Sequence, residues 1–577
     1  MLKTDYVIEK IPHPEYPRPQ MERKSFLNLN GEWQFAKCKR EEVPTSFGAI
    51  LVPFSPETEA SGVGNGFCLL DSEKLVYKRN IRLDKSMLIG TTYLHFGAVD
   101  QECEVFINGK KVGFHRGGYT PFSFDVTEFV TVGDNEIVVE VCDETELSHG
   151  ARGKQSSKPG GIWYTKQSGI WQTVWMESVP KIHIRSLKIT TNAQKKEVTI
   201  YSDCEKNQTI SVYDGDKRIF TGSFDSKSIT IKYDFTLWTP ENPKLYDFYL
   251  RTQTGDVVKS YFGVRSFSVG EDKKGKKRLM LNGKPYFMNG VLDQGYFPES
   301  LLTPPSDNAM FDDVQLLKDM GFNMVRKHIK IEPMRWYHYC DKLGLIVWQD
   351  FVNGGGEYKF SHVAALPFLG FNHKDNDYKY FAREDEKGRD EFINAVHETV
   401  GALYNVPSIG VWVPFNEGWG QFDSFKITNL VKSLDDSRII DSVSGWHDQG
   451  EDKTELKSMH TYYTKLKVPK DTRAVVLSEF GGYSLKTDGH VFNEDKEFGY
   501  KKFKSQNEYA EAVKELFLDK LAPLIEKGLS ASVYTQLSDV EEEINGLITY
   551  DRKVVKMPVD VMKSVNAIVQ KIASKIE

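Results

Sequence analysis

The sequence of 577 residues lacks the features that mark several classes of protein. Its 75 Lys and Arg are outnumbered by 81 Asp and Glu, and a net charge of -6 provides no broad basic field for nucleic acid or an anionic membrane. It has no unbroken apolar run of about 18 residues and no apolar signal core at its start, so we expect neither a membrane span nor export by that route. We therefore expect a cytoplasmic protein with small-molecule or carbohydrate partners, and a homo-oligomer stays open.

Paired cysteines are also lacking. The six cysteines, at positions 38, 68, 103, 142, 204 and 340, are scattered and include no CxxC pair. This spacing favours neither a zinc site nor a disulfide scaffold, so we interpret the cysteines as free thiols in a reducing compartment. Aromatic residues make up 12% of the chain, which suits stacking on sugar rings and equally suits large cores.

The first half of the chain has the pattern of β-sandwiches. Residues 1 to about 20 contain four prolines, which prevent regular structure and predict an extended arm. From there to residue 180, short alternating runs separated by turn signals such as Asn108-Gly109 predict an antiparallel sandwich, which completes a first domain of residues 1–180. Residues 181–269 have the length and strand spacing of an immunoglobulin-like sandwich without its disulfide.

Residues 270–577 change to alternating strands and helices. Amphipathic helical stretches separate most of eight short apolar runs, and right-handed βα crossovers force such strands into a parallel sheet that closes at eight. We therefore predict a C-terminal (β/α)8 TIM barrel. The expected strands are 287–292, 324–329, 345–351, 409–415, 439–443, 459–463, 474–478 and 531–536, and the clearest helices are 310–320, 333–343, 389–403 and 506–527.

Two acidic residues follow barrel strands. The fourth strand ends in Asn416-Glu417 and the seventh in Ser478-Glu479, so both carboxylates face the mouth formed by the carboxyl ends of the strands. Such a pair suits a glycosidase: a retaining enzyme holds its carboxyl groups about 5 to 5.5 Å apart, and an inverting one holds them further apart. The alternatives are that Glu417 caps a helix or pairs with an arginine, and that Glu479 only begins a loop.

Short motifs occur in a characteristic order along the chain. They are Leu29-Asn-Gly-Glu-Trp-Gln-Phe, Gly97-Ala-Val-Asp, Phe106-Ile-Asn-Gly, Ser168-Gly-Ile-Trp-Gln, Asn323-Met-Val-Arg-Lys-His, Tyr339-Cys-Asp-Lys-Leu-Gly-Leu, Asn416-Glu417 and Ser478-Glu479-Phe. Through these motifs the chain resembles glycoside hydrolase family 2, the family of β-galactosidases, β-glucuronidases and β-mannosidases, over nearly its whole length. The resemblance implies a jelly-roll fold for the first sandwich and a retaining mechanism. It further implies Glu417 as general acid/base, Glu479 as nucleophile and Asn416 as donor to the sugar 2-hydroxyl.

Other strand ends predict a sugar pocket. Arg326, Tyr462 or Tyr463 could keep Glu479 ionised, although Arg326 suits a structural ion pair too. Trp446 is a stacking platform or a buried barrel residue. The remaining candidates are Asp293, His328, Asp350 and His460, of which His328 also matches a family histidine. Neither histidine has a partner at convincing metal-ligand spacing, so we predict no essential metal and no cofactor.

Three departures concern the sugar. The Asn-x-Lys motif by which the family's uronic-acid readers hold the sugar carboxylate is missing after strand eight, where Asp539 and Glu541 would repel a carboxylate if they line the pocket. Residues 162–164 replace the aspartate that the first sandwich usually sends to the site, and Val291-Leu-Asp-Gln replaces the Asn-Arg-His-Glu type of strand one. An insertion of about 50 residues between strands three and four suits a wall or lid on the leaving-group side.

We accordingly expect a retaining exo-β-glycosidase, with a β-galactoside as first choice. A β-glucuronide, a galacturonide or another β-glycoside comes next. The rival of a different class is a non-catalytic carbohydrate-binding protein on the same scaffold, and a transglycosylase would share the same glycosyl-enzyme intermediate.

Overall fold

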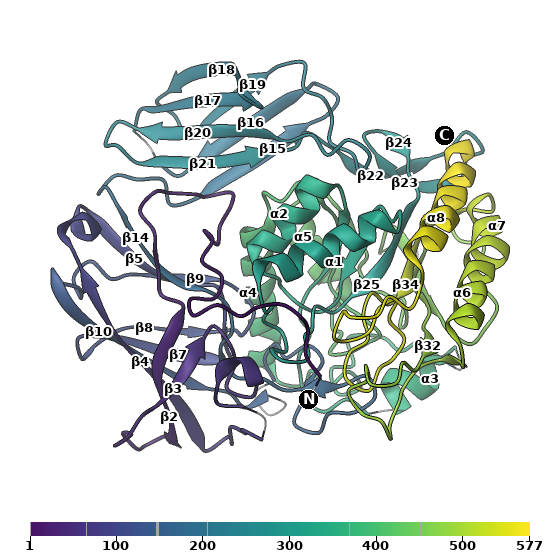
Figure 1. The fold of residues 1–577 in the computed structure, drawn as a ribbon. Helices are drawn as coiled ribbons and strands as arrows, with labels where there is room; N and C mark the ends of the chain where they lie inside the picture. Colours follow the sequence, from purple (N-terminus) through teal and green to yellow (C-terminus); the bar gives the residue numbers. More distant parts are fainter. Residues whose placement is uncertain are drawn as a thin grey trace.

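The computed structural model describes residues 2–64, 66–145, 149–204, 206–359, 361–368, 370–450 and 453–576. The chain forms a jelly-roll sandwich, an immunoglobulin-like sandwich and a TIM barrel, as the sequence predicted, and the two sandwiches lie on the same side of the barrel (Figure 1). Within the described residues, no helix combines the length and the apolar character needed to cross a membrane.

The jelly-roll sandwich consists of two main antiparallel sheets, with strand orders β3-β2-β4-β10-β7-β8 and β1-β14-β5-β9. Alternate residues of β10 are buried, as expected for strands with one face on a core. The elements are β1 (Leu27–Asn28), β2 (Gly31–Lys39), β3 (Gly48–Val52), η1 (Glu59–Ser61), β4 (Glu73–Leu83), η2 (Lys85–Leu88), β5 (Thr91–Phe96), β6 (Val99–Asp100), β7 (Glu102–Ile107), β8 (Lys110–Arg116), β9 (Phe122–Asp125), β10 (Gly133–Cys142), β11 (Gln155–Ser156), β12 (Tyr164–Thr165), β13 (Gly169–Ile170) and β14 (Val174–Val179).

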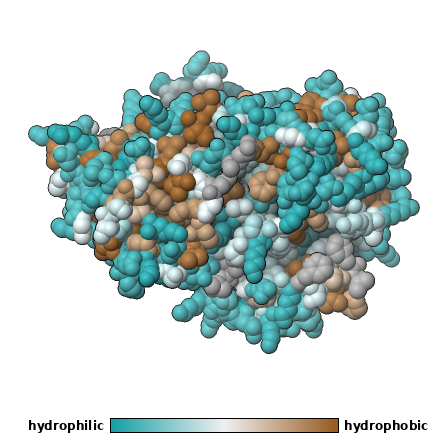
Figure 2. All heavy atoms as spheres, turned by 60° about the horizontal axis from the view of Figure 1, so that its bottom comes forward, coloured by the Kyte–Doolittle hydropathy of each residue, from teal (hydrophilic) through white to brown (hydrophobic). Residues whose placement is uncertain are grey.

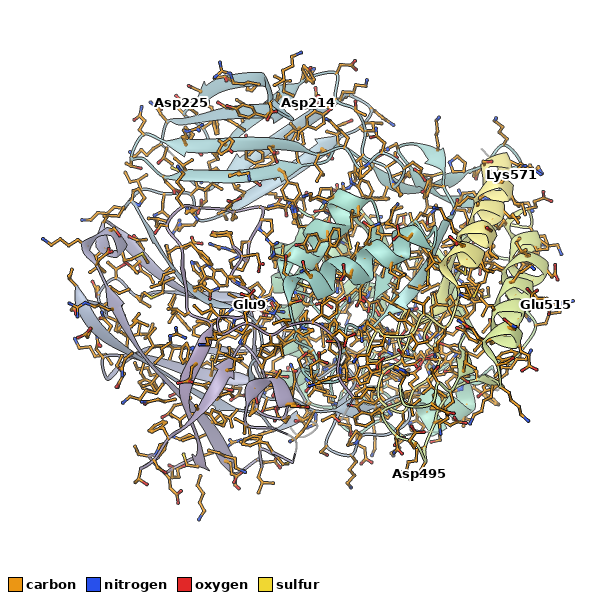
Figure 3. The ribbon with its side chains drawn as sticks, in the orientation of Figure 1. Glu9, Asp214, Asp225, Asp495, Glu515 and Lys571 are labelled. Atoms are coloured by element: carbon orange, nitrogen blue, oxygen red, sulfur yellow. The ribbon has the colours of Figure 1, made fainter. Side chains whose placement is uncertain are left out.

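The immunoglobulin-like sandwich pairs a sheet of order β15-β16-β19 with one of order β18-β17-β20-β21. Figure 3 shows Asp214 and Asp225 on its outer part, away from the barrel. Cys204 lies in its region and is free, like the other five cysteines. The strands are β15 (Leu187–Asn192), β16 (Glu197–Ser202), β17 (Gln208–Asp214), β18 (Lys217–Phe224), β19 (Ser228–Lys232), β20 (Tyr246–Thr252) and β21 (Val257–Phe262).

The barrel sheet has the order β29-β28-β27-β26-β25-β34-β31-β30, with parallel pairing throughout. All eight predicted strands are present, with ends shifted by up to three residues. They are β25 (Met288–Asp293), β26 (Met324–Lys327), β27 (Ile346–Asp350), β28 (Ile409–Val413), β29 (Ile439–Ile440), β30 (Leu456–Thr461), β31 (Ala474–Gly481) and β34 (Leu529–Thr535).

Helices cover the outside of the barrel, and a small sheet, β22 (Phe267–Glu271), β23 (Lys277–Leu281) and β24 (Lys284–Pro285), closes its amino-terminal end. The predicted helix 506–527 is interrupted by a π-helical stretch, η5. The remaining elements are α1 (Asp307–Asp319), α2 (Met334–Leu343), η4 (Ser361–Ala365), α3 (Leu366–Phe368), α4 (Glu386–Leu403), α5 (Ser424–Leu434), β32 (Tyr483–Leu485), β33 (Lys501–Phe503), α6 (Gln506–Glu515), η5 (Leu516–Leu521), α7 (Ala522–Ile525), α8 (Val559–Ala573) and η6 (Ser574–Ile576).

The barrel interior changes from apolar to charged along two neighbouring strands, β26 and β27. In β26, Met324 packs in the apolar cluster under the mouth, and Arg326, two residues later on the same face, carries a buried charge. In β27, Trp348 and Asp350 repeat this change. Polar groups therefore gather at the carboxyl ends of the strands, the end away from β23. That end lies at the bottom of Figure 1 and turns forward in Figure 2, where hydrophilic residues cover most of the face, with separate hydrophobic patches.

The predicted N-terminal arm is extended and packs along the barrel. Its contacts include Thr4 N–H with the Glu299 carboxylate at 3.3 Å and Gln20 Nε2, which donates to Asn405 O at 2.7 Å. The arm crosses the front of the barrel helices, dark purple in Figure 1 and marked by Glu9 in Figure 3.

Candidate active site

Glu417 and Glu479 lie together at the barrel mouth. Oxygen atoms from the two carboxylates and a ring nitrogen of His460 all lie within 4.8 Å of one another. Glu417 has φ of 52°, a left-handed conformation that a residue with a side chain rarely adopts, and strain of this kind is concentrated at functional sites. Its N–H donates to Ser444 O at 3.0 Å, so an isolated bridge between Asn416 and Ser444, beyond the ends of β28 and β29, holds the turn in place.

Arg326 links the pair to the barrel interior. Its guanidinium forms two hydrogen bonds to Asp350, at 2.9 and 3.0 Å, and one to Glu479 Oε1 at 3.1 Å. A further hydrogen bond reaches Asn416 Oδ1 at 2.8 Å. Arg326 is fully buried, so the positive charge acts on Glu479 with little screening by water.

Two more side chains hold the carboxylates. The Tyr462 hydroxyl donates to Glu479 Oε2, and its ring stacks on Tyr500 with centroids 3.8 Å apart. His460 lies between the acids: Nδ1 is 2.6 Å from Glu417 Oε1, and Nε2 is 3.5 Å from Glu479 Oε1. The imidazole therefore positions both carboxylates.

The two acids differ in proton affinity. Burial raises the pKa of Glu417, and the hydrogen bond from His460 offsets only part of this rise. Burial also acts to raise the pKa of Glu479, but the positive charges of His460 and Arg326 and the Tyr462 hydrogen bond outweigh it, so its pKa lies below the usual value. Of the two, Glu417 is therefore the group that keeps a proton more readily, while Glu479 stays ionised.

Further polar groups face the pair. Asn416 is 4% exposed, and its Nδ2 has no hydrogen-bond partner among the described residues, which leaves a donor for a ligand hydroxyl. His328 Nδ1 lies 2.7 Å from Asp350 Oδ2, and burial keeps the pKa of His328 well below its usual value. A neutral His328 that donates through Nδ1 presents Nε2 as an acceptor.

Three predicted pocket residues have different surroundings. Asp293 forms an ion pair with Lys327 at 2.6 Å inside a separate buried cluster. Tyr463 follows the end of β30, is 67% exposed and contacts the edge of Tyr500. Trp446 is half-buried, with its ring 6.3 Å from that of His460. The structure thus gathers the other predicted residues around Glu417 and Glu479, and Trp446 borders them.

The acids after strand eight are already occupied, contrary to their expected part in repelling a sugar carboxylate. Asp539 is paired with Lys556 at 2.6 Å in the interior. Glu541 accepts from Thr165 N–H at 2.9 Å, and burial raises its pKa to about 7. Asp539 and Glu541 therefore give no reason to prefer a neutral sugar over an acidic one.

The sandwich contributes Trp163, from the segment 162–164 that the sequence placed near the site, and Lys154, which the sequence interpretation missed. Trp163 packs on Trp419, two residues after Glu417, with ring centroids 5.1 Å apart, and on Tyr358 of the insertion at 5.8 Å. Lys154 lies beside Trp419 as well. A lysine in a polar loop far from the barrel in sequence gives no periodic signal. Of the insertion, Phe360 and Leu369 lie outside the described residues.

Glu417, His460 and Glu479 also form the group of ligand atoms that could hold a metal ion among the described residues. Their atoms already bind one another, Arg326 and Tyr462, and the guanidinium competes with any cation for Glu479. The absence of an essential metal stays a prediction.

Comparison with known proteins places the three domains of this chain in one family. The model described as "Glycosyl hydrolases family 2, TIM barrel domain" matches residues 273–565. The models for the family's sugar binding domain and for "Glycosyl hydrolases family 2" match residues 63–180 and 181–265. The chain belongs to glycosyl hydrolases family 2.

Two curated relatives are similar in sequence. A putative beta-glucuronidase of Formosa agariphila is 28% identical over 526 residues, which cover 81% of this chain and 58% of that protein. A beta-galactosidase of Thermoanaerobacter pseudethanolicus is 25% identical over 475 residues, which cover 73% of this chain and 58% of that protein. The chain thus spans little more than half the length of these relatives.

Two solved structures share the fold over nearly their whole length. A beta-D-glucuronidase of Dictyoglomus thermophilum has a TM-score of 0.73 and 17% identity, covering 96% of this chain and 98% of that one. A beta-galacturonidase of Eisenbergiella tayi has a TM-score of 0.68 and 18% identity, covering 98% of each chain. At these identities the likeness establishes the fold alone.

Proposed function

We propose that this protein is a retaining exo-β-glycosidase that hydrolyses terminal β-D-glycosides through a covalent glycosyl-enzyme intermediate. The observation that carries the proposal is the facing pair Glu417 and Glu479, whose oxygens lie within 4.8 Å and whose pKa values are shifted in opposite directions. An inverting enzyme holds its carboxyl groups further apart to admit a water between the base carboxylate and the anomeric carbon, so a pair this close favours retention.

In the first step, Glu479 attacks the anomeric carbon while the bond to the aglycone oxygen breaks and Glu417 gives that oxygen its proton. In the second, Glu417 takes a proton from water, which attacks the anomeric carbon and releases Glu479. The loss of the negative charge of Glu479 in the intermediate removes one cause of the raised pKa of Glu417, which suits its change from acid to base.

Arg326 and Tyr462 keep Glu479 ionised and aimed. The unpaired Nδ2 of Asn416 suits the sugar 2-hydroxyl, a contact that strengthens in the transition state of such reactions. His328 Nε2 is placed to accept from another hydroxyl. We keep the β-galactoside as the first choice of neutral sugar, and the names of the relatives add β-glucuronides and β-galacturonides to the test.

The test is a panel of 4-nitrophenyl β-glycosides: galactoside, glucoside, mannoside, arabinopyranoside, glucuronide and galacturonide. We expect one or two of them to be hydrolysed with kcat/KM far above the rest, and proton NMR to detect the β-anomer of the sugar as the first product. Release of the α-anomer first would exclude retention. Tight binding of a sugar without turnover of any glycoside would favour the carbohydrate-binding alternative.

A further inference from the structure

A loop of the jelly-roll sandwich covers part of the barrel mouth. Near its start, Gly153 N–H donates to Asn353 O, after β27, at 3.0 Å. Near its end, Gly161 N–H donates to Glu542 at 3.1 Å, the Tyr164 hydroxyl donates to Glu543, and Thr165 binds Glu541. Both ends of segment 151–165 are therefore attached to barrel loops, and the residues between them lie against the barrel mouth.

Lys154 lies in this segment and is 7% exposed. Its ammonium is 5.4 Å from the centre of the Tyr164 ring and 5.5 Å from the centre of the Trp419 ring. Across the part of the chain that the structure describes, no hydrogen bond or ion pair joins this ammonium to an acceptor. Two aromatic faces attract a cation but do not replace an anion as its partner.

Buried lysines of the barrel, unlike Lys154, pair with carboxylates. Lys327 pairs with Asp293 and Glu332, and Lys556 pairs with Asp539. A buried ammonium without a carboxylate costs free energy that a bound anion would recover. The acids of the strand-eight loop that the segment contacts, Glu541 to Glu543, accept hydrogen bonds from the segment itself.

The unpaired charge borders the catalytic pair. Trp419 follows Glu417 by two residues, and its ring lies 6.1 Å from that of His328. The charge of Lys154 is felt at both neighbours, where it lowers the pKa values of Glu417 and His328. We therefore expect an anion bound to Lys154 to be part of the substrate, whose glycosidic bond lies between the two carboxylates.

We propose that Lys154, held between Tyr164 and Trp419, binds an anionic substituent of the substrate, either the carboxylate of a uronic acid or a sulfate ester. This proposal rests on the proposed function, and it would give the chain an anion site on the sandwich in place of the missing motif after strand eight. The site selects between a sugar and its acidic counterpart, whereas Asn416 and the carboxylate pair act on both.

The test compares Lys154→Met with the wild type on matched substrates: 4-nitrophenyl β-galactoside, its 6-sulfate and the galacturonide, and the glucoside with the glucuronide. A charge-assisted hydrogen bond predicts a loss of about 10- to 100-fold in kcat/KM on the anionic member and little change on the neutral one. Lys154→Arg should restore much of the difference. Lys158→Met, which alters an exposed lysine of the same segment, should change neither. If Lys154→Met lowers kcat/KM on a uronide, the site binds a carboxylate. If it lowers kcat/KM on the 6-sulfate, the site binds a sulfate ester.

Binding separates this proposal from the proposed function. Calorimetric titration with galacturonate, glucuronate, galactose and galactose 6-sulfate needs no turnover, so it applies even if no glycoside of the panel is hydrolysed. Weaker binding of an acidic sugar to Lys154→Met, with unchanged binding of the neutral one, supports the site. Equal losses on charged and neutral sugars would make Lys154 a structural support only, and no loss on either would overturn the proposal.

Discussion

Replacement of Arg326 by methionine tests how the barrel keeps Glu479 ionised. The guanidinium satisfies Asp350 and Glu479 at once, and both acids are at least 95% buried. Methionine would leave two buried carboxylates without their cation, and breaking a buried ion pair costs about 3 to 5 kcal/mol. Loss of an adjacent opposite charge also raises the pKa of a carboxyl by about 1 to 3 units.

The sign of the pH effect follows from Glu479. Its pKa is depressed in the folded protein, so its ionised form contributes stability above the unfolded pKa, and this contribution is lost as the pH falls through the folded pKa. In Arg326→Met the folded pKa rises. The acidic limb of the profile of kcat/KM against pH should therefore move to higher pH by about 1 unit or more, and the variant should unfold at lower denaturant concentration.

Arg278 provides the control. It is 1% exposed and pairs with Asp272 at 2.9 Å at the opposite end of the barrel, where its Nη1 donates to Leu529 O. Arg278→Met should lower stability by a comparable amount and leave the acidic limb in place. An Arg326→Met variant that is destabilised but keeps the same acidic limb as Arg278→Met would show that Arg326 does not lower the pKa of Glu479.

Three further substitutions probe the same site. Tyr462→Phe removes one donor to Glu479, and steady-state kinetics should give a kcat/KM lower by about 10- to 100-fold, with an unchanged far-UV circular dichroism spectrum. His460→Gln removes a charge that lowers the pKa of Glu417, so the basic limb of the pH profile should move to higher pH, and an unmoved limb would contradict this role. Glu417→Gln should lower kcat/KM by about 10²- to 10⁴-fold on a phenyl glycoside. The loss should be smaller on a dinitrophenyl glycoside, because its leaving group needs no proton. Equal losses on the two substrates would refute the role of Glu417 as the acid.

Much of the architecture could be predicted from the sequence because local patterns carry it. Eight apolar runs interleaved with amphipathic stretches fix the order of strands and helices, and the position of Glu417 and Glu479 directly after two of these runs places both at the mouth. Strand boundaries such as Leu456–Thr461 were less predictable, because the ends depend on ladder hydrogen bonds with neighbouring strands rather than on composition.

The surroundings of the pair depend on contacts that no local pattern encodes. The choice between Tyr462 and Tyr463 depends on how the chain turns after the end of β30, which brings the Tyr462 hydroxyl to Glu479 and leaves Tyr463 67% exposed. The pairing of Asp539 with Lys556 and of Asp293 with Lys327 decides which acids remain available, and these partners become neighbours only in the folded barrel. Lys154 lies in another domain, so only the packing of the sandwich on the barrel brings it to Trp419.

Chemical rescue by azide tests the catalytic assignment most directly. Without added azide, we expect Glu479→Ala to be nearly inactive on a dinitrophenyl β-glycoside. We expect Glu417→Ala to form the glycosyl-enzyme intermediate but to turn over slowly, because no base activates the water. Azide should restore Glu479→Ala with formation of the α-glycosyl azide, because the small anion attacks from the side that Glu479 vacates. It should restore Glu417→Ala with formation of the β-glycosyl azide, because azide takes the place of water in the attack on the intermediate.

Glu299→Gln, at a buried acid that binds Thr4, should retain the activity of the wild type. The same azide anomer from both alanine variants, or full activity of either without azide, would contradict the account.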